Sequence, residues 1–209
     1  MKSDILKELN VSRETLDRLD LYESLIKKWN PRINLISRHT LNEIWTRHFL
    51  DSAQIWRLRP ENPRKWLDLG SGGGFPGLVI AIIAAEATPE MKVTLVESDA
   101  RKAGFLMKAG QEMGILPEII IDRAERLSPQ HADVVSARAL APLDLLLDYA
   151  APHLAENGRC LFSKGENYES ELTAARKCWT FSLQKSPSRT GHGGVILQIG
   201  DIRRANSRN

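Results

Sequence analysis

The chain has 209 residues, of which 42% are hydrophobic and 26% are charged. This length suits one sizeable α/β domain with an attachment and excludes two full domains. Its two cysteines, Cys160 and Cys178, lack metal-site spacing and make no disulfide framework, so we expect a reducing, cytoplasmic setting. No stretch approaches about 18 uncharged apolar residues and the N-terminus lacks a signal-peptide core, so we expect neither a membrane span nor export.

The net charge of +3 hides an uneven distribution along the chain. Residues 24–59, the N-terminal flank, carry a net +5, and residues 176–209, the C-terminal flank, carry a net +6. The residues between them, 60–175, carry a net −6. Basic flanks around an acidic centre are expected where the flanks meet nucleic acid, although solvated surface charge would give the same count.

The first part of the chain is helical in pattern. Apolar residues spaced three and four apart predict a helix that Ser12 caps and that Pro31 ends. Thr40 and Glu43 form a capping-box pattern for a second helix. His48 lies on that helix, and we favour a packing histidine that is hydrogen-bonded to a neighbour over a catalytic one.

A polar segment with two prolines, residues 59–64, is typical of a linker. It divides the chain into an N-terminal helical lobe, residues 1–59, and a main domain, residues 60–209. The main domain alternates strand and helix patterns, which predicts an α/β fold with a doubly wound, mostly parallel sheet and a late antiparallel edge hairpin. The predicted strands lie near residues 66–69, 92–97, 118–121, 133–136, 158–162, 181–185 and 195–199.

A glycine-rich turn follows the first of these strands. Its sequence is Asp68-Leu-Gly70-Ser71-Gly72-Gly-Gly-Phe75, which leaves phenylalanine where a dinucleotide fingerprint needs its third glycine. An acidic residue two positions before alternating glycines instead resembles motif I of S-adenosylmethionine (SAM) methyltransferases. Asp68, Gly70, Ser71 and Gly72 are therefore candidate cofactor-binding residues.

Residues that follow the other strands complete a candidate site, because ligands of such sheets bind beyond the carboxyl ends of the strands. Glu97 ends the second strand, where an acidic side chain would receive the ribose hydroxyls of an adenosine. The segment 122–125 after the third strand suits contacts with the adenine. Arg138 after the fourth strand and Lys164 after the fifth are expected near the cofactor and the acceptor.

Several acceptor chemistries lack their usual residues. Ser136-Ala-Arg-Ala139 stands where enzymes that methylate exocyclic amines commonly carry Asn/Asp-Pro-Pro-aromatic. Cytosine C5 chemistry needs a cysteine nucleophile, and both cysteines are expected to be packing residues. No cluster resembles a metal site. Guanine N7 needs neither nucleophile nor metal, because its lone pair is free at neutral pH, so the pattern permits N7 chemistry without proving it.

With these motifs in hand, the chain resembles the RsmG family, bacterial 16S rRNA guanine-N7 methyltransferases also called glucose-inhibited division protein B. The resemblance spans about residues 25–165. Its matching segments are Trp29-Asn30 with Asn34-Leu35, Arg47-His48 with Asp51-Ser52, Leu67–Gly77, Leu95–Ser98 with Lys102 and Phe105-Leu106, Arg123–Glu125, Ser136–Ala139, and Lys164-Gly165.

The resemblance implies a class I, Rossmann-like SAM-dependent methyltransferase with an N-terminal helical extension that contacts RNA. It implies SAM contacts at Gly70, Phe75, Ala124, Glu125 and Arg138, with Glu97 resting on the general fold. Arg123, Arg138 and Lys164 are the catalytic candidates, and they would face the cofactor or the rRNA.

The implied substrate is a guanosine in the decoding-region loop of 16S rRNA, guanine-527 in the usual rRNA numbering, within small-subunit particles. We expect a cytoplasmic monomer that binds neither DNA nor membrane and holds no metal. Two alternatives remain open: a SAM methyltransferase with a non-RNA substrate, and a non-catalytic RNA-binding assembly factor with a vestigial SAM pocket.

Overall fold

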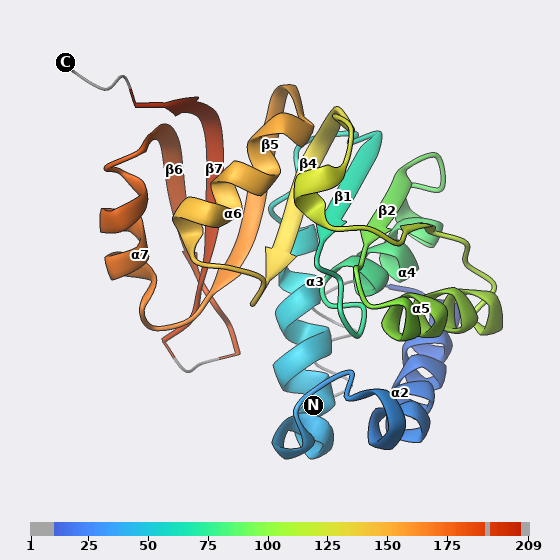
Figure 1. Ribbon diagram of the computed structural model, residues 1–209. Helices are drawn as coiled ribbons and strands as arrows, with labels where there is room; N and C mark the ends of the chain where they lie inside the picture. The colour runs from blue at the N-terminus through green and yellow to red at the C-terminus, as the bar shows by residue number, and fades with distance from the viewer. Residues whose placement is uncertain (1–10, 191–192, 206–209) are drawn as a thin grey trace.

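The computed structural model describes residues 11–190 and 193–205 (Figure 1). Its centre is a seven-stranded sheet in the order β3-β2-β1-β4-β5-β7-β6. Neighbouring strands from β3 to β5 are parallel, and β7 runs antiparallel to both β5 and β6. The predicted doubly wound sheet is confirmed, although only β6 of the late hairpin is an edge strand, because β7 lies inside the sheet.

The elements follow the predicted order. The strands are β1 (Lys65–Leu69), β2 (Lys92–Val96), β3 (Glu118–Ile120), β4 (Ala132–Arg138), β5 (Leu154–Lys164), β6 (Trp179–Pro187) and β7 (Val195–Arg204). The α-helices are α2 (Arg13–Ile33), α3 (Asp51–Trp56), α4 (Gly77–Ala87), α5 (Ala100–Glu112), α6 (Leu143–Ala150) and α7 (Tyr168–Ala175). Short 3₁₀ segments are η1 (Arg38–Glu43), η3 (Ala124–Arg126) and η4 (Ala151–His153), and η2 (Trp45–Leu50) is a π-helix.

Helix α4 explains how the N-terminal helices attach to the sheet. Residues 77–84 are all buried, since α4 packs on β2 on one side and on α2 and α3 on the other. A helix that is apolar on every side is stable only when it is covered on every side. The N-terminal helices thus share one hydrophobic cluster with α4 and α5, and α6 and α7 cover the opposite sheet face with a second cluster. The division at residues 59–60 stays a prediction.

Two predictions about the N-terminal helices are wrong. Helix α2 continues through Pro31 and ends at Ile33, where Asn34 takes a left-handed conformation with φ of 51°. Thr40 does not cap a helix, because it lies inside η1, and its hydroxyl bonds to Ser37 and His48 instead. The cap at Ser12 is confirmed, since its side chain accepts from the Thr15 amide.

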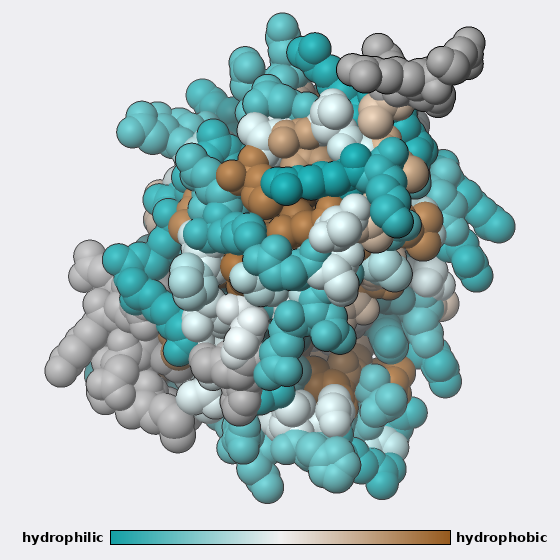
Figure 2. Space-filling view, turned by 90° about the vertical axis from the view of Figure 1, so that its left-hand side faces the viewer, coloured by the Kyte–Doolittle hydropathy of each residue, from teal (hydrophilic) through white to brown (hydrophobic). Residues whose placement is uncertain are grey.

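The outer face of α7 and β6 is largely hydrophilic, with apolar residues exposed in patches between polar side chains (Figure 2). Within the described ranges, 11–190 and 193–205, no helix is long and apolar enough to cross a membrane.

Candidate functional site

The glycine-rich turn is built on a buried carboxylate. Asp68 is fully buried on β1, and its Oδ1 accepts from the Ser136 hydroxyl on β4 at 2.6 Å. Its Oδ2 accepts from the Gly77 amide at the start of α4 at 3.1 Å. Burial raises the pKa of Asp68 to about 6, although Ser136, Ser71 and the Gly77 amide oppose the shift. Asp68 therefore joins β1, β4 and α4 and does not face a cavity.

Glu97, the residue directly after β2, holds the same turn. Its Oε2 accepts from the Gly72 amide at 2.7 Å, and its Oε1 accepts from the Asp99 amide at 2.8 Å. Ser71 is also buried, and its hydroxyl donates to the Asp68 carbonyl. Each Glu97 oxygen keeps a further acceptor site, so the expected bond to a ribose stays a prediction.

Phe75 ends the turn inside an aromatic cluster from the N-terminal helices. Its ring centroid lies 5.5 Å from that of Tyr22 and 4.9 Å from that of His48. The Tyr22 hydroxyl donates to the Gly73 carbonyl. Gly74 has φ of +97°, and a Cβ there would lie 2.8 Å from the Cβ of Leu78, so only glycine fits this close approach.

A cavity of about 260 Å³, the Gly70 cavity, opens at the carboxyl ends of β1 and β2. Gly70 has φ of +65°, and the side chain of Leu140 lies where a Cβ of residue 70 would point. The lining residues are Gly70, Val96, Ser98, Asp122, Arg123, Ala124, Glu125, Leu140, Ala141, Pro142, Leu145 and Tyr149. The structure thus brings four predicted residues together: Gly70, Arg123, Ala124 and Glu125.

The side chains of Arg123 and Glu125 are 64% and 43% exposed at this cavity, and their charged groups lie 3.7 Å apart. An exposed pair of this kind contributes little to stability. Both side chains are therefore free to turn toward a ligand.

A larger cavity of about 640 Å³, the Arg138 cavity, lies beside the first and shares Leu140, Ala141 and Pro142 with it. The N-terminal helices, the loop after β4, the end of β5 and the loop between β6 and β7 surround it. Its polar and charged lining is Thr40, Arg47, His48, Asp51, Arg138, Ser163, Lys164, Glu171, Ser188 and Thr190.

Arg138 is held by three acceptors from the N-terminal helices. Its Nη1 donates to the Arg47 carbonyl at 3.1 Å and to Asp51 Oδ2 at 3.2 Å, and its Nη2 donates to His48 Nδ1 at 2.7 Å. The guanidinium carbon lies 5.0 Å from the centroid of the Phe75 ring, which is close enough for a cation–π contact. Arg138 is therefore fixed between the glycine-rich turn and the Arg138 cavity.

His48 is neutral in this arrangement. Arginine can only donate, so the Nδ1 that meets Arg138 must carry a lone pair. The proton then lies on Nε2, which donates to the Thr40 hydroxyl at 2.8 Å, and Thr40 donates in turn to the Ser37 carbonyl. Burial, with the nearby Arg138 and Arg47 charges, lowers the pKa of His48 to about 3.

Asp51 connects Arg138 to the loop between β6 and β7. Its Oδ1 accepts from Gln54 Nε2 at 2.9 Å and from the hydroxyls of Ser188 and Thr190 at 3.3 Å. This carboxylate thus joins three segments that are far apart in the sequence.

Lys164 fixes the loop that separates the two cavities. Its Nζ donates to the Ala141 carbonyl and to Glu171 Oε2, each at 2.7 Å. The same Glu171 oxygen accepts from the Leu143 amide at 2.8 Å. With only 8% of its side chain exposed, Lys164 anchors the loop after β4 at the cavity wall.

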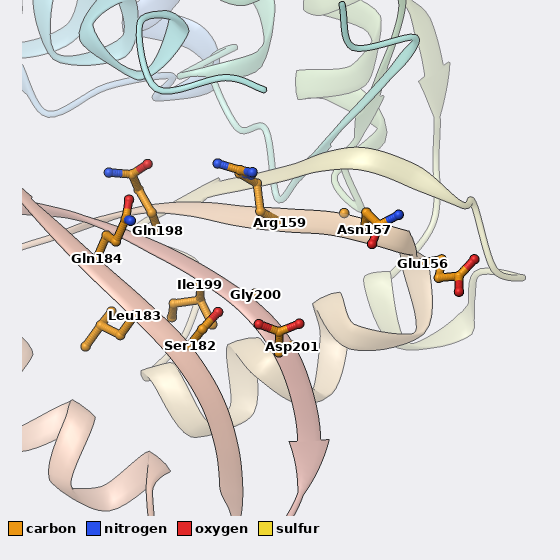
Figure 3. A pocket seen from close by; sticks show the side chains of 11 residues that line it. Glu156, Asn157, Arg159, Ser182, Leu183, Gln184, Gln198, Ile199, Gly200 and Asp201 are labelled. Carbon is orange, nitrogen blue, oxygen red and sulfur yellow. The ribbon is translucent and has the colours of Figure 1, made fainter. Parts of the chain in front are cut away.

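A further groove of about 440 Å³ opens over β5, β6 and β7 (Figure 3). Figure 3 shows Arg159, Gln184 and Gln198 pointing to the same side of these strands. None of the predicted site residues lines this groove. It therefore lies apart from the candidate site.

Neither cysteine lines the Arg138 cavity. Cys160 is buried within β5, where burial raises the pKa of its thiol, and Cys178 is exposed after α7. Among the residues with assigned positions, no three His, Cys, Asp or Glu side chains could together hold a metal ion.

The comparison with protein families decides the assignment. The family model described as rRNA small subunit methyltransferase G matches residues 15–195. The chain belongs to this family. A Cereibacter sphaeroides protein named ribosomal RNA small subunit methyltransferase G is 51% identical over 199 residues, covering 95% of this chain and 97% of the relative. A Ruegeria relative of the same name is 49% identical over 197 residues, covering 94% and 96%. The resemblance to the RsmG family is confirmed.

Solved structures of other methyltransferases support the fold assigned to this chain. A methyltransferase from Geobacter sulfurreducens superposes with a TM-score of 0.56 at 14% identity, covering 88% of this chain and 87% of that one. The mitomycin 7-O-methyltransferase gives a TM-score of 0.57 at 17% identity, covering 81% and 59%. These likenesses show the class I methyltransferase fold. Family and fold together imply SAM as the methyl donor.

The residues at the Gly70 cavity fit this cofactor. A Cβ at Gly70 would lie 2.5 Å from Leu140 Cδ1, so glycine lets the turn and the Leu140 side chain approach closely at the cavity, and the segment from Asp122 to Glu125 offers polar groups for an adenosine. Leu145 and Tyr149 supply an apolar wall against which a purine could pack. When bound, SAM supplies an electrophilic methyl group on a sulfonium.

Sequence reasoning assigned no site role to Asp51 or Leu140, and it predicted Thr40 only as part of a helix cap. Asp51 belonged to a segment that resembles the family, and it stands one turn after His48. A polar pair at this spacing beside an apolar helix face is the signal that could have indicated an inward-facing network.

Proposed function

We propose that this chain transfers the methyl group of SAM to N7 of a guanosine in the decoding-region loop of 16S rRNA. The names of the relatives, which specify ribosomal RNA and the small subunit, support an rRNA substrate. The state of the titratable groups around the Arg138 cavity supports the N7 acceptor.

The carboxylates and the imidazole that line this cavity are already engaged. Asp51 accepts from Arg138, Glu171 accepts from Lys164, and the His48 lone pair accepts from Arg138. None of the three is poised as a general base. Guanine N7 needs no base, because its lone pair attacks without loss of a proton, so transfer depends on alignment and electrostatics.

The charge balance of the Arg138 cavity also suits an N7-methylated guanine, which carries a positive charge. Methylation at N7 moves positive charge from the sulfonium to the purine. Arg138 and Lys164 are each paired with a carboxylate, so among the described residues that line the cavity only the Arg47 cation is left without an ion pair to oppose a cationic base. Arginine and lysine can also donate to guanine O6 or to a phosphate, which would orient the nucleotide.

Labelled transfer assays test the proposal. The protein is incubated with methyl-labelled SAM and small-subunit particles, bare 16S rRNA or 23S rRNA, and the modified nucleoside is identified by mass spectrometry. We expect 7-methylguanosine in small-subunit material only. SAM binding without transfer would favour the assembly-factor alternative, and no label in any small-subunit material would refute the proposed activity.

A further inference from the structure

His48 joins the N-terminal helices to the strand that carries Arg138. It comes from η2, and the 2.7 Å bond to Arg138 spans 90 positions in the sequence. Both ring nitrogens are used, one toward Arg138 and one toward Thr40, and the ring packs 4.9 Å from Phe75. The imidazole therefore has one orientation and one tautomer.

A neutral acceptor is the right partner for this guanidinium. Arg138 already meets the Asp51 carboxylate, which balances its charge. A second anion beside Arg138 would place another partly desolvated charge in the wall of the Arg138 cavity. An imidazole lone pair accepts from a second N–H group of Arg138 and adds no charge. His48 thus limits how the flexible arginine side chain can place its charge beside the two cavities.

We propose that His48 is a positioning residue for methyl transfer, which acts by holding the Arg138 guanidinium through Nδ1 against the ring of Phe75. This inference rests on the proposed function. His48 does not take a proton from the acceptor. Its effect reaches the reaction only through Arg138.

Two substitutions test the bond itself. His48→Leu removes the acceptor, and His48→Asn keeps an amide oxygen near the place of Nδ1. We expect kcat to fall about 10- to 100-fold for His48→Leu, the scale of a misplaced catalytic group. KM for SAM should stay within about twofold, and His48→Asn should restore most of kcat. His39→Asn is the matched control, because His39 is exposed on the neighbouring η1 and should leave kcat unchanged.

A double-mutant cycle with Arg138→Lys separates positioning from packing, because coupled residues give non-additive effects. If His48 acts through Arg138, His48→Leu should cost less than about threefold in the Arg138→Lys background. An equal loss in both backgrounds, or a folded His48→Leu variant with normal kcat, would overturn the inference.

Thr40→Val gives a second measurement if His48→Leu does not fold. It removes the partner at Nε2 and leaves Nδ1 in place, so kcat should fall only about two- to fivefold. A loss as large as that of Arg138→Lys, or no loss, would contradict the proposal. Wild-type protein that fails to methylate any small-subunit material would instead refute the proposed function.

Discussion

The N-terminal and C-terminal flanks carry net charges of +5 and +6, yet their basic side chains lie in different surroundings. In the N-terminal flank, the side chains of Arg32, Arg38 and Arg47 form no ion pair within the described ranges, and Arg47 lines the Arg138 cavity. In the C-terminal flank, Arg204 pairs with Asp148 and lies 4.1 Å from the ring centroid of Trp179. Charge alone therefore does not say which flank serves the site.

Strand register places much of the C-terminal flank away from the site. Strand β7 begins at Val195, paired with Lys164 at the cavity edge, and ends at Arg204, paired with Trp179. Ten residues of strand cover about 30 Å, so Arg204 lies at the opposite edge of the sheet. Figure 1 shows this separation, with the end of β7 at the top left of the view and α3 lying below it, on the other side of the sheet's carboxyl edge. The N-terminal flank lines the Arg138 cavity, and the end of the C-terminal flank does not.

Substitution of Arg138, which the N-terminal flank holds, should have the largest effect on methyl transfer. Arg138→Ala should lower the rate of methyl transfer by at least about 10³-fold. Removal of one well-placed polar or charged group at a reacting centre commonly lowers kcat by about 10² to 10³. In addition, the Arg47 carbonyl, Asp51 and His48 would each lose the donor that Arg138 supplies. Circular dichroism checks the fold, and the labelled assay measures transfer. Arg159→Ala, an arginine in the groove of Figure 3, is the control and should keep normal turnover. Near-normal turnover of Arg138→Ala would remove Arg138 from the site.

The ion pairs of the two flanks should differ in their contribution to stability. Asp51→Ala should lower the free energy of unfolding by about 2–3 kcal/mol, because Arg138 and the hydroxyls of Ser188 and Thr190 lose an acceptor in a largely buried place. Asp148→Ala breaks the exposed pair with Arg204 and should cost less than about 1 kcal/mol. Urea unfolding measures both free energies. Equal losses would show that the Asp51–Arg138 pair contributes no more to stability than the exposed Asp148–Arg204 pair.

The architecture could be predicted from the sequence because each helix, strand and turn has a pattern within its own short segment of the chain. Strand and helix patterns gave the order of the elements, and the turn from Asp68 to Phe75 fixed the superfamily. The residues that follow β1, β3, β4 and β5 meet at the carboxyl edge, as expected for a parallel sheet.

The details of the site depended on contacts that no local pattern encodes. A carboxylate beside a glycine turn can face a ligand, accept backbone amides or do both, and the sequence did not predict that Asp68 and Glu97 accept the amides of Gly77 and Gly72. The pairing of His48 and Asp51 with Arg138 joins residues about 90 positions apart. Neither outcome follows from spacing or composition.

The neutral His48 predicts a pH dependence of stability that belongs to the N-terminal flank. Its folded pKa of about 3 lies below the ordinary 6.5, so its contribution is full above pH 6.5 and is lost as the pH falls toward 3. The unfolded chain takes up a proton in this window, and the folded chain, with Arg138 and Arg47 facing the ring and Asp51 bound to Arg138, does not. The difference in unfolding free energy between wild type and His48→Asn should therefore change by up to about 1.4 kcal/mol per pH unit. A difference that stays constant from pH 7 to pH 4 would contradict the prediction.

RNA affinity should likewise depend more on the N-terminal flank than on the C-terminal flank. Combined replacement of Arg32, Arg38 and Arg47 by alanine should weaken binding to small-subunit rRNA about tenfold at moderate salt. Each lost phosphate contact should flatten the dependence of log affinity on log salt by about 0.7 to 0.9. Filter binding over a range of salt concentrations gives both quantities.

The smallest effect is expected from the far end of the C-terminal flank. Combined replacement of Lys177, Arg203 and Arg204 removes the same formal charge as the N-terminal triple variant. If only the total field of the protein mattered, the two losses of affinity would be equal. Because these three residues lie at the sheet edge opposite the cavity and Arg204 is already paired with Asp148, we expect less than about a twofold change and an unchanged salt slope. A tenfold loss would mean that the RNA extends along β6 and β7 to the far edge of the sheet, and that both flanks grip it.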